Sequence, residues 1–248
     1  MENPVLIEYK SQAAVITLNR PERRNAINEA LLRGLYDGLE KAASDEKTRV
    51  IIITGKGPAF CAGLDLGCLE TENLVDPRGD GRDLVDIAAD CTKPIIGAVN
   101  GPAVTGGFEL ALNCDFLIAS ENAAFADTHA KVGIRPGWGM TQLLQQAVGQ
   151  RLAKQFSLTC QWISARQALA CGLVNEVTAP EELMSRAEAI ARMICETDYK
   201  TALTVKGLME YRNRATFAEA LENERKPLKE LVAASGRSFT SQELNTRD

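Results

Sequence analysis

Two apolar runs, each followed by a glycine-bearing loop, restrict the fold of this chain more than any other feature. Residues 94–99 are apolar, and residues 100–115 continue as Asn-Gly-Pro-Ala-Val-Thr-Gly-Gly-Phe-Glu-Leu-Ala-Leu-Asn-Cys-Asp. The pattern predicts a buried strand, a glycine turn and an amphipathic helix. Gly106 and Gly107 then fall near the helix start, where amides lack intrahelical partners and the dipole is positive. Such a helix end stabilises an anion.

A second segment predicts a matching loop. Val50 to Thr54 is a continuous apolar run with high strand propensity, and a turn cluster follows at residues 55–58. Residues 59–66 read Ala-Phe-Cys-Ala-Gly-Leu-Asp-Leu, in which Ala62 and Gly63 are small enough for a ligand to approach the main chain. Two loops at strand ends, each with a free amide, would both donate a hydrogen bond to one oxygen atom.

Glu109 is the strongest catalytic candidate from the sequence. It lies three residues after Gly106 and so shares a helix face with it. A carboxylate at a helix start is expected to favour its ionised form, in which it acts as a base or orients a water molecule. An amide donor beside a carboxylate suits chemistry next to a carbonyl group. The alternative is an acidic residue that only complements the helix dipole.

These two loops and three further motifs resemble the crotonase superfamily, also called the enoyl-CoA hydratase/isomerase family. The further motifs lie, in the family's order, at residues 18–27, 133–139 and 164–174. Alternating strands and helices already indicate an α/β protein, and the resemblance implies a spiral of β-β-α turns. It also implies a core with the acyl-CoA site at residues 1–181 and a helical region at 182–248 that mediates trimers, often paired into hexamers.

The resemblance assigns roles to several residues. The amides of Leu64 and Gly106 would hold the thioester oxygen of an acyl-CoA, beside Glu109. His129 stands where hydratases of this family carry a second glutamate, and the sequence there is Asp127-Thr128-His129. An imidazole titrates near neutral pH, so His129 is a candidate proton donor. A purely structural histidine is the alternative, and Asp127 would share its face in an extended segment.

Other residues are candidates for contacts with the substrate. Arg23, Arg24 and Lys56 carry cations that suit the phosphates of CoA. Trp138 is expected to line the acyl pocket or to belong to the core, and Asp65 to shape its loop. The full set of predicted substrate-binding residues is Arg24, Ala26, Lys56, Ala62, Asp65, Leu66, Gly107, Asp127 and Trp138.

Composition excludes several classes of function. The net charge of −5 gives no basic surface for nucleic acid, and no uncharged apolar run reaches the ~18 residues of a membrane span. Seven cysteines without a Cys-x-x-Cys pair, and a single histidine, argue against a zinc site. Reduced thiols and the absence of a targeting pattern predict a cytoplasmic protein. A mitochondrial matrix protein whose presequence has been removed would look the same.

We therefore expect a lyase that hydrates trans-2-enoyl-CoA to 3-hydroxyacyl-CoA. Glu109 would activate the water, and His129, Asp127 or the water itself would protonate C2. Isomerisation or decarboxylation through the same enolate is one alternative, and a non-catalytic acyl-CoA binder is another. No metal or redox cofactor is implied, since CoA belongs to the substrate. The expected partners are the acyl-CoA and further copies of the chain, as a homotrimer or hexamer.

The sequence also predicts individual elements. A hairpin is expected at residues 5–18, a helix capped by Asn28 to about Ser44, and a short helix at 83–91. Residues 70–83 are predicted to form a mobile surface loop. Residues 182–243 read as helical, with an apolar stripe that needs a partner surface. The stripe consists of Leu203, Leu208, Phe217, Leu221, Leu228 and Leu231.

Overall fold

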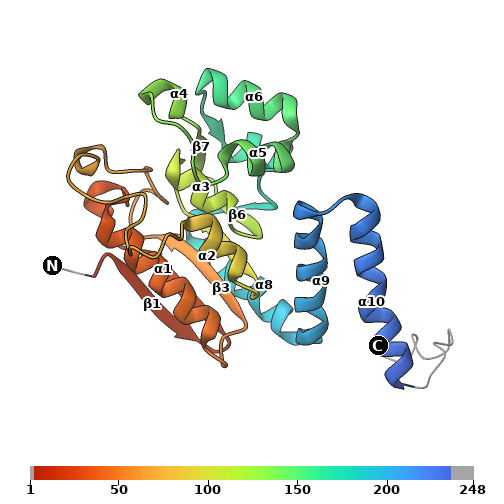
Figure 1. Ribbon diagram of the computed structural model, residues 1–248. Helices are drawn as coiled ribbons and strands as arrows, with labels where there is room; N and C mark the ends of the chain where they lie inside the picture. Colours follow the sequence, from red (N-terminus) through yellow and green to blue (C-terminus); the bar gives the residue numbers. More distant parts are fainter. Residues whose placement is uncertain (1–2, 236–248) are drawn as a thin grey trace. The chain divides into compact units, whose positions relative to one another are not determined.

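The structure is a computed structural model that describes residues 3–235 (Figure 1). The chain divides into two compact units, Met1–Tyr199 and Lys200–Asp248, and each is described by itself. The sequence placed this division after residue 181. In the structure the first unit extends further, because helix α8 (Leu183–Glu196) packs on its sheet.

A six-stranded sheet forms the centre of the first unit. Its strand order is β1-β2-β3-β4-β6-β9. The first pair is antiparallel and every later pair is parallel. The strands are β1 (Val5–Lys10), β2 (Ala13–Leu18), β3 (Val50–Gly55), β4 (Ile95–Val99), β6 (Phe116–Ser120) and β9 (Glu176–Thr178). The predicted hairpin and the two predicted apolar strands are confirmed.

Helices cover both faces of this sheet, which explains why its central strands are apolar at nearly every position. In β3, Ile51 and Ile53 belong to the large core cluster that includes helix α1 (Glu29–Ser44). Val50 and Ile52 instead join a second cluster with Leu183, Ala187 and Ala191 of α8. Alternate residues of one strand thus enter two cores, because successive side chains point to opposite faces.

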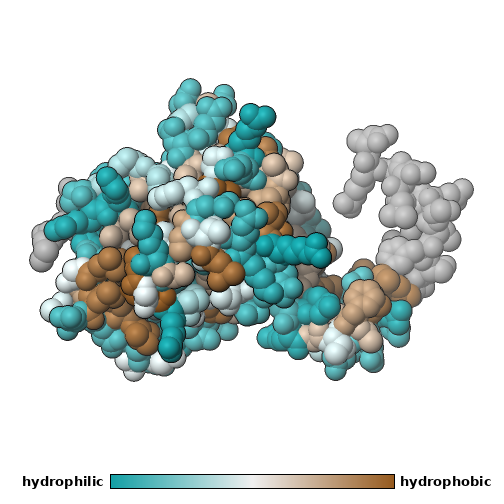
Figure 2. All heavy atoms as spheres, turned by 90° about the horizontal axis from the view of Figure 1, so that it is seen from above, coloured by the Kyte–Doolittle hydropathy of each residue, from teal (hydrophilic) through white to brown (hydrophobic). Residues whose placement is uncertain are grey.

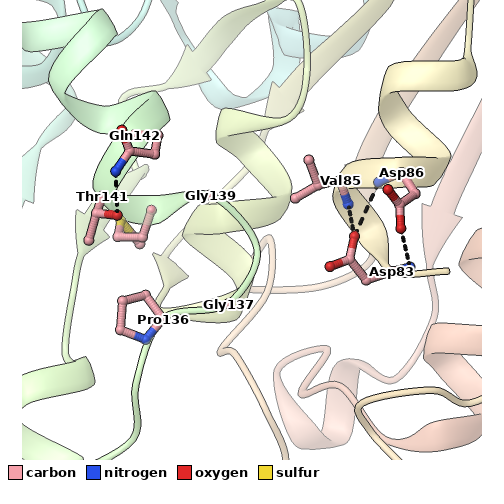
Figure 3. A pocket seen from close by; sticks show the side chains of 9 residues that line it. Asp83, Val85, Asp86, Pro136, Gly137, Gly139, Thr141 and Gln142 are labelled. Carbon is pink, nitrogen blue, oxygen red and sulfur yellow. Dashed lines mark hydrogen bonds between the residues drawn. The ribbon is translucent and has the colours of Figure 1, made fainter. Parts of the chain in front are cut away.

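Two helices of the first unit begin as the sequence predicted. The side chain of Asn28 accepts a hydrogen bond from the amide of Leu31 and caps α1. Helix α2 (Leu84–Asp90) starts with a capping box, in which the side chains of Asp83 and Asp86 each bind the other's amide. Figure 3 shows this box beside the segment that carries Pro136 and Gly139.

A small second sheet brings the starts of two helices together. Strand β5 (Ala103–Val104) pairs in parallel with β7 (Ala124–Ala126), and β8 (Ile163–Ser164) pairs antiparallel with β7. Helix α3 (Gly106–Leu112) follows β5, and helix α4 (His129–Val132) follows β7. Since parallel strands end at the same edge, α3 and α4 begin side by side. The rest of this region is α5 (Met140–Val148), α6 (Gln150–Thr159) and α7 (Ala165–Ala170).

Residues 70–83, expected to be a mobile loop, are tied to α1 by arginines. Arg78 contacts Glu40 at 2.6 Å, and Arg82 contacts the other oxygen of the same carboxylate at 2.6 Å. The guanidinium of Arg78 also lies over the ring of Tyr36, at 5.5 Å from the ring centroid. These contacts lower the pKa of Glu40, chiefly through the hydrogen bond from Arg78.

The second unit contains the rest of α9 (Tyr199–Tyr211) and α10 (Phe217–Ser235). The predicted helical tail is confirmed to residue 235, and its residues 236–243 lie outside the described part of the chain. Several apolar side chains of this unit are exposed, and Figure 2 shows apolar side chains on the surfaces of both units. Across residues 3–235, no helix is both long and apolar enough to cross a membrane.

Candidate active site

A strained turn leads from β5 into α3. Thr105 has φ 51° and ψ −111°, a conformation that β-branched residues rarely adopt. Its hydroxyl contacts the hydroxyl of Thr128 and accepts a hydrogen bond from the Thr128 amide. The two helix starts therefore hold each other in place, and the strain is stored where α3 begins.

The two glycine loops predicted from the sequence pack directly on each other. Cys61 pairs with Ala103 in a β-bridge. Gly63 has φ +87°, and an added Cβ there would lie 2.7 Å from the carbonyl oxygen of Val104 and 3.4 Å from the Gly106 nitrogen. Only glycine fits this approach without displacing the main chain. The segments before Leu64 and before Gly106 are thus in van der Waals contact.

Leu64 and Gly106 both line a cavity of about 500 Å³. Among the described residues, neither amide donates a hydrogen bond to a main-chain carbonyl group outside the regular elements. The neighbouring Gly63 carbonyl and Asp65 amide both bond to Ile27, which fixes the direction of the Leu64 peptide. The geometry is suited to two amides acting on one ligand oxygen, and this role remains a prediction.

The cavity is mostly apolar and has a few polar groups in its wall, as is usual for sites of small ligands. Its lining comes from the two loops, from residues 69–75, and from residues 128–138. A shallower hollow lies between the start of α2 and residues 136–142 (Figure 3). Asp83 and Gly137 line both spaces.

Glu109 is 2% exposed and lines the cavity. Its Oε1 accepts hydrogen bonds from the amides of Trp138, at 2.8 Å, and Met140, at 3.2 Å. Burial raises the pKa of this carboxyl, and the amide of Trp138 only partly opposes the effect. The expectation that the helix start would favour the ionised form is therefore wrong, because desolvation outweighs the helix end.

His129 faces Glu109 across the cavity wall. Its Nε2 lies 3.6 Å from Oε2 of Glu109, and its Nδ1 lies 2.7 Å from Oδ1 of Asp127. The ring is 6% exposed and lines the cavity. The structure thus brings the two predicted acid–base residues, Glu109 and His129, together. The carboxylate of Asp127 contacts the other ring nitrogen of His129.

The predicted substrate-binding residues separate into two groups. Ala62, Leu66 and Trp138 line the cavity. Trp138 also belongs to the core cluster, so it lies where the cavity borders the core. The other residues lie outside the cavity lining in the described structure: the side chains of Arg24 and Lys56 are exposed, Asp65 pairs with Arg20, Gly107 packs on Cys61, Ala26 accepts from Arg20, and Asp127 contacts His129.

Two residues that support the site were given no role by the sequence. Asn25 is fully buried, and its amide group donates to the carbonyl oxygens of Lys56, Ala59 and Phe60. It therefore holds the loop that presents Leu64. Asn25 adopts a left-handed conformation, with φ 55°, which asparagine tolerates better than most residues. Ser157, from α6, lies near Asp127 and helps to lower the pKa of that carboxyl, and no local pattern predicts this proximity.

A mostly parallel sheet with covered faces, a helix start beside a cavity, and a buried carboxylate opposite a histidine define an enzyme with an acid–base site. Residues 8–242 match the enoyl-CoA hydratase/isomerase family. The chain belongs to this family and has the crotonase fold.

Relatives of this chain carry related names. "Probable enoyl-CoA hydratase 1, peroxisomal" of Arabidopsis thaliana is 38% identical over 89% of this chain and 84% of its own length. "Short-chain-enoyl-CoA hydratase" of Clostridium acetobutylicum is 39% identical over 77% of this chain and 75% of its own. The crystal structure of an enoyl-CoA hydratase from Mycobacterium smegmatis has a TM-score of 0.74 and 41% identity, with coverages of 94% and 97%.

Proposed function

We propose that this protein hydrates trans-2-enoyl-CoA thioesters to 3-hydroxyacyl-CoA. One observation carries the proposal: Nε2 of His129 lies 3.6 Å from Oε2 of Glu109 in the wall of a cavity that Leu64 and Gly106 also line. Hydration needs one group that takes a proton from water and one that gives a proton to carbon. Relatives named as enoyl-CoA hydratases support the same reaction.

The thioester oxygen binds between the amides of Leu64 and Gly106. Glu109 takes one proton from a water molecule, and the resulting hydroxide adds to C3. The electron pair of the double bond moves toward the thioester, so negative charge collects on the oxygen between the amides. Each such donor contributes about 3 kcal/mol to the stabilisation of a charged intermediate.

His129, in its protonated form, then gives the proton on Nε2 to C2. The raised pKa of Glu109 makes it a stronger base than an exposed carboxylate. After the reaction Glu109 holds the proton that it took from water, and His129 is neutral. Passage of one proton from Glu109 to His129, which face each other, restores the starting state without any cofactor.

Three finer points belong to the same proposal. The exposed cations of Arg24 and Lys56 are suited to the phosphates of CoA. The chain forms homotrimers or hexamers, since apolar side chains of the second unit are exposed and need a partner surface. These side chains are Val205, Met209, Phe217, Leu228 and Leu231. The protein acts in the cytoplasm or in the mitochondrial matrix.

The test uses crotonyl-CoA and follows the loss of its conjugated enoyl absorbance. The wild-type protein is expected to remove this absorbance rapidly, and Glu109→Gln to lower turnover by about 1,000-fold. Glu121→Gln, a charge-matched change at an exposed position, should retain wild-type turnover. Binding of crotonyl-CoA without turnover would contradict hydration and leave a binding protein. Turnover of 3-enoyl-CoA alone would instead establish an isomerase.

A further inference from the structure

We propose that Asp127 is the positioning residue for His129, and that it holds Nδ1–H so that Nε2 faces Glu109 and the cavity. The kinetic consequence rests on the proposed hydration, whereas the position of the imidazole proton does not. Asp127, first considered as a substrate contact or a proton donor, would then act only through His129.

The geometry leaves the imidazole little freedom. Oδ1 of Asp127 accepts a hydrogen bond from the main-chain amide of His129 at 3.2 Å and lies 2.7 Å from its Nδ1. One oxygen atom therefore fixes both the start of α4 and the ring of its first residue. Because an ionised carboxylate only accepts hydrogen bonds, the nitrogen facing it must carry a proton.

Asp127 is placed to remain ionised. It is 2% exposed, and burial alone would raise its pKa. The hydrogen bonds from His129, together with the nearby Ser157, outweigh that effect, so the pKa of Asp127 lies below its ordinary value. The carboxylate thus keeps its charge within the core beside the ring, where a negative charge stabilises an imidazolium.

Asp127 lies outside the residues that line the cavity, whereas His129 and Glu109 lie within them. It is therefore placed behind the histidine, where it orients the ring and compensates its charge without touching the substrate. With Nδ1–H held by Asp127, only Nε2 is left to exchange a proton with Glu109 or with C2. The opposite tautomer would direct a permanent N–H at Glu109 and leave Nδ1 without a proton for the carboxylate.

The chain contains a single histidine, so a spectrum of the imidazole nitrogens needs no assignment. The experiment uses the tag-free, full-length protein with ¹⁵N-labelled histidine, at a pH where the ring is neutral. We expect the Nδ1–H tautomer in the wild-type protein. Asp127→Asn should keep this tautomer, since its side-chain oxygen can accept both bonds of Oδ1, and Asp127→Ala should lose it.

Turnover of crotonyl-CoA provides the second readout. We expect Asp127→Ala to lower kcat by about 100-fold and to leave KM nearly unchanged, since Asp127 touches His129 and not the substrate. Asp127→Asn should also lower kcat, because the charge beside the imidazolium is lost. Ser157→Ala should have a smaller effect in the same direction. Glu188→Gln, which removes a charge from the pair with Lys10, should leave both readouts unchanged.

Two results would overturn the proposal: an Nε2–H tautomer in the wild-type protein, or the same tautomer and turnover in Asp127→Ala as in the wild type. If Asp127→Ala does not fold, Asp127→Asn and Ser157→Ala still provide the kcat comparison. Failure of hydration itself is distinguishable. If the wild-type protein has the Nδ1–H tautomer but turns over no enoyl thioester, the proposed hydration is wrong, whereas the positioning role of Asp127 stands.

Discussion

The carbonyl oxygen of Cys61 lies 2.2 Å from the point that a Cβ atom on Gly107 would occupy. The main chains of the two loops are therefore in direct contact at the base of the site. No side chain fits between them, so the position of Gly106 depends on the residue after it. A side chain at position 107 would therefore displace the main chain, although Gly107 lies outside the cavity lining in the described structure.

Gly107→Ala should destabilise the first unit by about 2 kcal/mol, because overpacking forces the main chain to shift. It should also lower turnover, since the Gly106 amide moves with it. Gly207→Ala is the matched control, as Gly207 is also helical and an added Cβ there meets no atom of the described residues within 4 Å. The control should be stabilised by up to about 1 kcal/mol. Urea unfolding measures the change in stability, and crotonyl-CoA assays measure the change in turnover. Wild-type stability and turnover in Gly107→Ala would contradict the close packing of Gly107 on Cys61.

His129→Ala should lower turnover by about tenfold or more, because the proton for C2 loses its donor. His129→Glu should retain or raise turnover, since it restores a second carboxyl group opposite Glu109. The measurement is kcat with crotonyl-CoA near neutral pH, with the folded state of each variant checked by its thermal transition. A wild-type rate in His129→Ala would remove the residue from the mechanism.

The thermal stability of Glu109→Gln relative to the wild type should increase with pH. The pKa of Glu109 lies above its ordinary value of 4.5 because of burial. Its folded form therefore binds a proton more tightly than the unfolded chain does. That contribution to stability is fully present below the ordinary pKa and is lost as pH rises through the raised one.

Glutamine does not titrate, so the stability of the variant does not decrease in this way as pH rises. Thermal unfolding at about pH 4.5 and at about pH 8 measures the difference in Tm between variant and wild type. Glu121→Gln at an exposed position serves as the control and should show little change. A difference that shrinks toward pH 8 would show that Glu109 is stabilised in its ionised form.

Arg78→Met should weaken substrate binding more than it slows the chemical step. Its guanidinium ties residues 70–83 to Glu40, and Leu74 and Val75 of this segment line the cavity. Loss of about 1 kcal/mol of pairing corresponds to a rise in KM of about fivefold. Arg186→Met, which breaks a pair with Glu176 at the other edge of the sheet, is the control. High salt should raise the KM of the wild type toward that of the variant, because salt screens the ion pair. An unchanged KM in Arg78→Met would contradict a role of the Arg78–Glu40 pair in substrate binding.

Local patterns were sufficient for the framework of the first unit. The cap at Asn28, the short helix at residues 83–91 and the apolar run of β3 each carry their signal within a few residues. The glycines that open α3 likewise identified the helix start beside the cavity. These features depend on propensity and on backbone geometry, both of which a short window of sequence contains.

The features that the sequence did not predict depend on contacts between residues far apart in the chain. The raised pKa of Glu109 follows from its burial, which outweighs the hydrogen bond from the Trp138 amide and which no periodicity shows. The tie between Arg78 and Glu40 joins residues 38 apart, so a polar, glycine-rich segment looked mobile. The contact of Ser157 with Asp127 likewise joins α6 to the start of α4. Sequence reasoning identified the ionisable residues of the candidate site but not the neighbours that set their properties.

Helix α8 has a consequence for the order in which the protein acquires its structure during synthesis. The sheet face formed by Val15, Ile52, Ile96 and Ile118 is covered by a helix that leaves the ribosome after every strand has been made. Until then this apolar face is open to water and to other nascent chains. A fragment that stops at residue 181 would contain all six strands of the sheet and still aggregate, whereas one that ends at Tyr199 would keep the covering helix.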